Sequence, residues 1–93
     1  MTIRDLVSKY IRSTERVLAE MKVVQNLTRV DEEKVKHVVD HAKRYLEDAK
    51  YYEERKEFET SLASVAYCEG LLDALRLLGG VEFSWQAGKE RSC

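Results

Sequence analysis

The chain contains no proline, and apolar residues recur at steps of three and four along most of its 93 residues. Proline breaks helices, and this spacing places side chains on one helix face, so the two features together predict long, uninterrupted helices. The sequence therefore predicts an all-α protein. A chain of this length forms one small domain with a thin core.

Three helices are predicted, over about 2–24, 32–55 and 57–78. Residues 1–80 are then one helical domain, and 81–93 are a short irregular C-terminal tail. Capping residues support these boundaries. The residues that indicate helix ends are Thr2 with Asp5 as a capping pair, Asp31 as an N-cap, Val30 with Val35 as a hydrophobic staple, and Gly79 with Gly80 as a left-handed C-terminus. The break between the first two helices is expected at 26–29.

The tail begins with an alternating run of Val81, Phe83 and Trp85. One short alternating run cannot form a sheet alone. The run is expected to fold back over the end of the bundle, with residues 86–93 mobile.

The third helix is unusually apolar. Its polar residues Glu69, Asp73 and Arg76 fall on one narrow strip, and almost every other residue of its second half is apolar or small. A helix that is apolar most of the way round is buried on more than one side. We expect this helix to be central to the fold, or to bury one of its faces against another chain.

Small residues Ala66, Gly70 and Ala74 recur at every fourth position of this helix, with Tyr67 and Asp73 beside them. Glycine within a helix costs about 1 kcal/mol relative to alanine, so a compensating contact is expected. Three interpretations remain: a tight intramolecular helix crossing, a homodimer seam, or a ligand cleft. The crossing predicts that Gly70→Leu lowers the melting temperature markedly. The aromatic residues expected to fill such a groove are Tyr10, Tyr45 and Tyr52.

Charge and composition narrow the function. There are 16 basic and 17 acidic residues, for a net charge of −1, so a strong electrostatic footprint for nucleic acid is not predicted, although Lys9, Arg12 and Arg16 share a helix face. No apolar stretch approaches the roughly 20 residues of a membrane span, and the N-terminus lacks a signal-peptide core. We expect a cytoplasmic protein. Scarce amides beside abundant charge are typical of thermophile proteins.

No catalytic or cofactor site is predicted. His37 and His41 have the i, i+4 spacing that could share one zinc ion, but no third ligand is evident, and two surface histidines are the preferred interpretation. Cys68 lies in an apolar run and is expected to be a small buried hydrophobe.

The run from Tyr45 to Tyr52, then Phe58, then Ala66 to Ala74 and Leu78-Gly79 resembles the archaeal domain-of-unknown-function family 357. The pattern Y-x-x-G-x-L-D-A, from Tyr67 to Ala74, is the most specific part. The resemblance implies a three-helix up-and-down bundle of archaeal origin with no established activity, sometimes joined to nucleotidyltransferase-like enzymes. The turn at Arg55-Lys56-Glu57 departs from the Gly-Asp that the family pattern favours.

Two functions follow as hypotheses. The first is a non-enzymatic interaction or assembly module that binds a protein partner, or a second copy, through the third helix. The alternative is an accessory small-ligand or nucleotide-binding domain of a nucleotide-processing system, with Tyr67, Asp73 and Asp48 as polar groups near Gly70.

Overall fold

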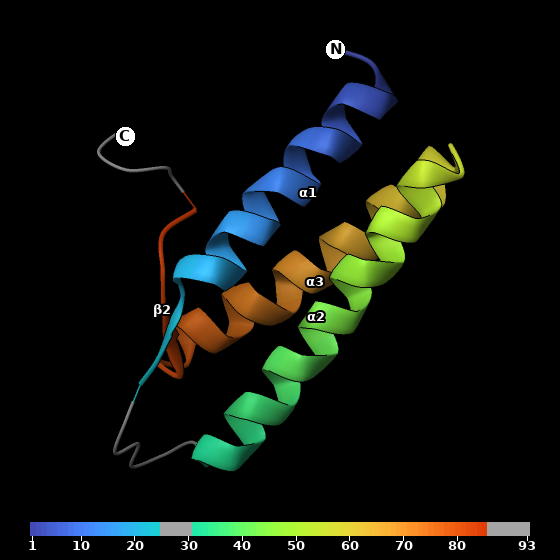
Figure 1. The fold of residues 1–93 in the computed structure, drawn as a ribbon. Coiled ribbons are helices and arrows are strands. Elements are labelled where there is room, and N and C mark those ends of the chain that lie inside the picture. Colours follow the sequence, from blue (N-terminus) through green and yellow to red (C-terminus); the bar gives the residue numbers. More distant parts are fainter. Residues whose placement is uncertain (25–30, 86–93) are drawn as a thin grey trace.

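The computed structural model describes residues 1–24 and 31–85. Its elements are α1 (Ile3–Glu20), β1 (Lys22–Val23), α2 (Glu32–Glu54), α3 (Phe58–Leu77) and β2 (Val81–Glu82) (Figure 1). The three helices pack against one another, which confirms the all-α three-helix bundle. The predicted break at 26–29, the staple partner Val30 and the tail segment 86–93 lie outside the described residues.

Helix ends follow the capping residues in the sequence. Thr2 and Asp5 form a reciprocal capping box at α1, and the Asp31 carboxylate accepts a hydrogen bond from the backbone of Glu33 at the start of α2. Gly79 adopts a left-handed φ of 81° after α3. Gly80 packs closely against α2, since an added Cβ would lie 3.0 Å from a methyl group of Val35, which would have to shift.

The turn between α2 and α3 uses the same geometry without glycine. Lys56 has φ 63°, its backbone N–H donates to the carbonyl of Glu53, and the N–H of Glu57 donates to the carbonyl of Tyr52. This pair of bonds is a Schellman motif, which normally has glycine at the left-handed position. Lys56 therefore adopts a conformation that is costly for a residue with a Cβ.

The core is a layer of small and medium apolar side chains where the three helices meet. Val7, Val17, Val65 and Leu72 are fully buried. The buried residues of α2 recur at alternating steps of four and three along one helix face, namely Val35, Val39, Ala42, Leu46 and Ala49. The spacing of apolar residues in the sequence therefore matches the buried face of α2.

The predicted C-terminal end of the first helix is wrong. α1 ends at Glu20, and Lys22–Val23 form β1, which pairs antiparallel with β2 in the register Lys22–Glu82 and Val23–Val81. The alternating run therefore pairs with a segment that the periodicity assigned to a helix. The expected folding back of the run is confirmed, since Val81 is buried and Phe83 and Trp85 pack against the core.

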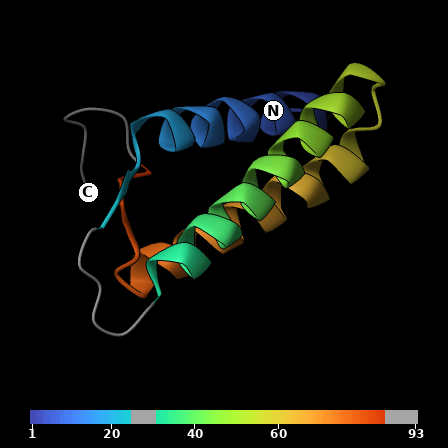
Figure 2. The same cartoon turned by 60° about the horizontal axis from the view of Figure 1, so that its bottom comes forward.

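α3 contacts both other helices, as its apolar character predicts. α2 and α3 lie side by side, whereas α1 approaches them near the α2–α3 turn and diverges toward the end that carries β1 and β2 (Figure 2). The two-stranded ribbon lies at this wider end. Within the described residues, no helix combines the length and hydrophobicity needed to cross a membrane.

Candidate functional site

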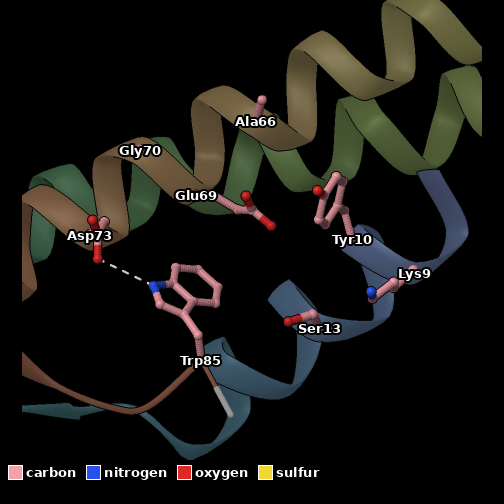
Figure 3. A pocket seen from close by; sticks show the side chains of 8 residues that line it. All are labelled: Lys9, Tyr10, Ser13, Ala66, Glu69, Gly70, Asp73 and Trp85. Atoms are coloured by element: carbon pink, nitrogen blue, oxygen red, sulfur yellow. Dashed lines mark hydrogen bonds between the residues drawn. The ribbon is translucent and has the colours of Figure 1, made fainter. Parts of the chain in front are cut away.

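A cavity of about 450 Å³ lies between α1 and α3, beside the segment that follows β2. Pockets of this size accommodate small molecules. α1 and α3 supply opposite walls, and the indole of Trp85 lies at one end of the space between them (Figure 3). The lining residues are Lys9, Tyr10 and Ser13 from α1, Ala66, Glu69, Gly70 and Asp73 from α3, and Trp85.

Trp85 is held from two sides. Its indole Nε1 donates to Asp73 Oδ1 of α3 at 3.2 Å, while its backbone carbonyl accepts from Arg16 Nη2 of α1 at 2.6 Å. Its ring also packs edge-on against Phe83, with centroids 4.9 Å apart. These contacts fix the aromatic end of the cavity relative to both helices.

Asp73 accepts hydrogen bonds from Arg76 as well as from Trp85. Its Oδ1 accepts from Arg76 Nε at 3.0 Å and from Arg76 Nη2 at 2.9 Å. The hydrogen bond from Arg76, followed by that from Trp85, lowers the pKa of Asp73 below its ordinary value. Asp73 is therefore an ionised carboxylate that positions the indole.

Glu69 differs from Asp73. Its carboxylate points into the space between Tyr10 and Trp85 (Figure 3), and its hydrogen-bond donor is the buried hydroxyl of Thr14, at a long 3.5 Å. Burial raises the pKa of Glu69, and the nearby charge of Asp73 raises it further. Among residues 1–24 and 31–85, no cation pairs with this carboxylate.

Of the three interpretations of the small residues around Gly70, the tight helix crossing is wrong. A Cβ added to Gly70 would meet nothing within 4 Å, and Ala66 and Ala74 are exposed. Of the tyrosines expected to fill the groove, Tyr10 lines the cavity, whereas Tyr45 packs against Tyr67 with ring centroids 4.4 Å apart. Gly70 is open because α1 diverges from α3, which short-range sequence patterns do not reveal.

The small residues belong to a larger exposed surface, which we call the outer face of α3. Its bulky members Tyr67, Leu77 and Leu78 are 53%, 73% and 63% exposed. The complete set consists of Ala63, Ala66, Tyr67, Gly70, Ala74, Leu77 and Leu78, all exposed. This face borders the cavity through Ala66 and Gly70, so the structure brings Ala66, Gly70 and Asp73 to the cavity and leaves Tyr67 and Ala74 on the outer face.

The remaining candidates lie elsewhere. The rings of His37 and His41 on α2 are 4.8 Å apart, and within the described part of the chain no three histidine, cysteine or acidic residues gather where they could hold a metal ion. Asp48 is exposed on α2 and does not line the cavity. Cys68 is fully buried, as predicted, and burial raises the pKa of its thiol to about 12.

Sequence reasoning missed two contributors, Trp85 and Glu69, as parts of one site. Glu69 was recognised only as part of a polar strip, together with Asp73 and Arg76. The available signal was that two carboxylates interrupt an otherwise apolar helix. Whether these carboxylates form one site with Trp85 depends on the path of residues 81–85 through the fold. That path is a long-range property.

The family model for "Protein of unknown function (DUF357)" matches residues 9–81. The chain belongs to this family. The match includes all of α2 and α3 and the greater part of α1, and therefore both helices that form the cavity. No curated protein and no solved structure matches the chain.

Proposed function

We propose that this DUF357 protein is a non-enzymatic assembly module whose partner is a second copy of itself, bound through the outer face of α3. The observation that carries the proposal is that this face exposes apolar and small residues over four helical turns, from Ala63 to Leu78, without a charged side chain. Of the charged residues in the same stretch, Glu69 and Asp73 line the cavity between α1 and α3, and Arg76 bonds to Asp73. Exposed apolar patches of this kind mark interaction sites.

The exposed face of α2 shows what a solvated helix looks like in this chain. Its exposed positions carry mostly charged side chains, including Lys36, Asp40, Lys43, Arg44 and Glu47. In a chain with 35% charged residues, the outer face of α3 is therefore exceptional. Charged side chains keep a surface hydrated and oppose association, so their absence from this face of α3 favours association.

The spacing on this face is that of a helix–helix seam. Five of its residues, Ala63, Tyr67, Gly70, Ala74 and Leu77, follow alternating steps of four and three. This is the repeat by which two helices pack side chains along a shared seam. Gly70, at the middle of the series, allows the closest approach of two backbones.

The distribution of side-chain size favours an antiparallel pair of identical helices. If the two-fold axis passes at Gly70, Tyr67 of one copy lies opposite Ala74 of the other, and Ala63 lies opposite Leu77. Each bulky side chain then faces a small one. A parallel pair would instead place tyrosine opposite tyrosine and alanine opposite alanine, so bulky and small side chains would not complement each other. The outer face is therefore complementary to itself, as a two-fold interface requires.

The non-enzymatic part of the proposal is supported by how the reactive groups are used. The buried hydroxyl of Ser61 donates to the carbonyl of Ala49 at 2.6 Å, and the hydroxyl of Ser8 donates to Glu53 at 2.6 Å. Both bonds join helices. The raised pKa of Cys68 keeps its thiol protonated at neutral pH and therefore unreactive.

The test is sedimentation equilibrium over a wide concentration range on the wild-type chain, on Ala74→Glu and on Ala19→Glu. Both alanines are exposed on helices, so both variants are expected to fold, and circular dichroism checks this. We expect reversible dimerisation of the wild type and of Ala19→Glu, and a monomer for Ala74→Glu. A wild-type chain that stays monomeric at the highest concentration, or equal dimerisation of both variants, contradicts the proposal.

A further inference from the structure

The cavity beside the outer face has a charge distribution that the assembly function does not use. Glu69 and Asp73 contribute two carboxylates and Lys9 contributes one ammonium group. Asp73 is already bonded to Arg76 and Trp85. Glu69 faces the cavity with only the long hydrogen bond from Thr14, so one carboxylate inside the cavity has no counter-ion among the described residues.

The walls on either side of this carboxylate are aromatic. Tyr10 and Trp85 flank the end of the Glu69 side chain in Figure 3. Aromatic faces attract cations, and the attraction strengthens where water is partly excluded. A carboxylate between two aromatic rings is a combination that recognises a positively charged group attached to an apolar body.

We propose that this cavity binds an organic cation, a guanidinium or primary ammonium group on an apolar stem, with Glu69 as the counter-ion and Tyr10 and Trp85 as the walls. Ala66 and Gly70 form the adjoining surface of α3, where no larger side chain occupies the space. The apolar stem packs there, against the backbone that Gly70 leaves uncovered. This binding activity is separate from self-association and does not depend on it.

A phosphate or nucleotide fits the same cavity poorly. Phosphate sites use several backbone N–H donors at a helix N-terminus, or several cations. The α3 residues that line this cavity come from within the helix and not from its first turn. Lys9 is the one cation among the lining residues, whereas Glu69 is a carboxylate that pairs with no cation of the described residues. An unpaired carboxylate between two aromatic rings, with a single ammonium group nearby, therefore suits a cation better than an anion.

The protein contains a single tryptophan, Trp85, so its fluorescence reports directly on the cavity. Full-length protein is titrated with butylguanidinium and with butylammonium, and butylurea serves as a neutral probe of nearly the same shape as butylguanidinium. We expect saturable fluorescence changes with both cations and none with butylurea. Equal responses to butylurea and butylguanidinium would overturn the proposal, because shape alone would then explain binding.

Three variants assign the interaction to its residues. Glu69→Gln keeps the side-chain shape and is expected to weaken cation binding about tenfold or more, the effect typical of removing a hydrogen-bonded charge. Lys9→Gln removes a like charge and is expected to strengthen binding a few-fold. The control Asp48→Asn neutralises an exposed carboxylate on α2, outside the cavity, and should bind like the wild type. Unchanged affinity in Glu69→Gln, or an equal loss in Asp48→Asn, would overturn the assignment.

The source of the cation is distinguished by a second probe, a capped tripeptide with arginine at its centre. Tighter binding of the peptide than of butylguanidinium identifies an arginine of a partner chain as the ligand, and the reverse order identifies a free small molecule. In both cases, binding of the tighter ligand must depend on Glu69. Repeating the titration on Ala74→Glu separates this site from assembly, since we expect that variant to retain cation binding.

Discussion

Gly70→Ala gives the most informative test of the packing around α3. Gly70 lies within the helix, is exposed, and would have no atom within 4 Å of an added Cβ. Alanine is favoured over glycine inside a helix by about 1 kcal/mol, because glycine loses more backbone entropy on folding. With no clash to offset this gain, the substitution should increase the free energy of unfolding by about 1 kcal/mol. For a domain of this size, such a change raises the melting temperature by about 4–8 °C.

The assay is thermal and urea unfolding followed by far-UV circular dichroism, at a concentration low enough to keep the protein monomeric. Ala74→Gly is the matched control, since it makes the reverse change at an exposed position one turn away and should lower stability by a similar amount. At high concentration the prediction for Gly70→Ala changes, because an added methyl group on the two-fold axis should weaken dimerisation. A loss of stability in the Gly70→Ala monomer would refute the open position of Gly70 and restore the tight helix crossing.

Three further predictions concern the turn at Lys56, the indole of Trp85 and the partly buried carboxylate of Glu69. Lys56→Gly should raise stability by about 1 kcal/mol, measured by urea unfolding, because glycine adopts the left-handed φ of 63° without a Cβ clash; a destabilised variant would contradict this turn geometry. Asp73→Ala should lower the fluorescence anisotropy of Trp85, whereas Asp73→Asn, which keeps an acceptor oxygen, should retain it; equal loss in both variants would show that the hydrogen bond does not hold the indole. For Glu69 the folded-state pKa is raised by burial, so its contribution to stability is greatest at acidic pH and is lost as pH rises through that pKa. The stability of Glu69→Gln relative to the wild type should therefore increase from acidic to neutral pH, and a difference that does not vary with pH would contradict the shift.

Local signals in the sequence determined much of the fold. The capping residues Thr2 and Asp31, the C-terminal glycine Gly79 and the apolar face of α2 act over one or two helical turns, and the structure contains each of them as expected. The end of α1 was mispredicted because its helical period continues through Met21 and Val24. Pairing of Lys22–Val23 with Val81–Glu82 overrides that period, and pairing between segments so far apart has no signal in a window of a few residues.

The candidate site was predicted only in part. The third helix was correctly identified as unusual, and Ala66, Gly70 and Asp73 do line the cavity. The contribution of Trp85 depends on how the chain returns after α3, and the openness of Gly70 depends on the divergence of α1. Both are long-range properties, so the same small residues that indicated a tight crossing prove to be exposed.

Self-association through α3 is tested most directly by disulfide cross-linking between single cysteines placed on its outer face. Cys93→Ser provides the background, and the buried Cys68 is left in place because its thiol has a pKa raised to about 12. In an antiparallel pair, Gly70→Cys should link to its own copy under mild oxidation, and Ala63→Cys should link to Leu77→Cys in a mixture but not to itself. Equal self-linking at positions 63, 70 and 77 would show a parallel pair, and no link at position 70 would contradict dimerisation through this face.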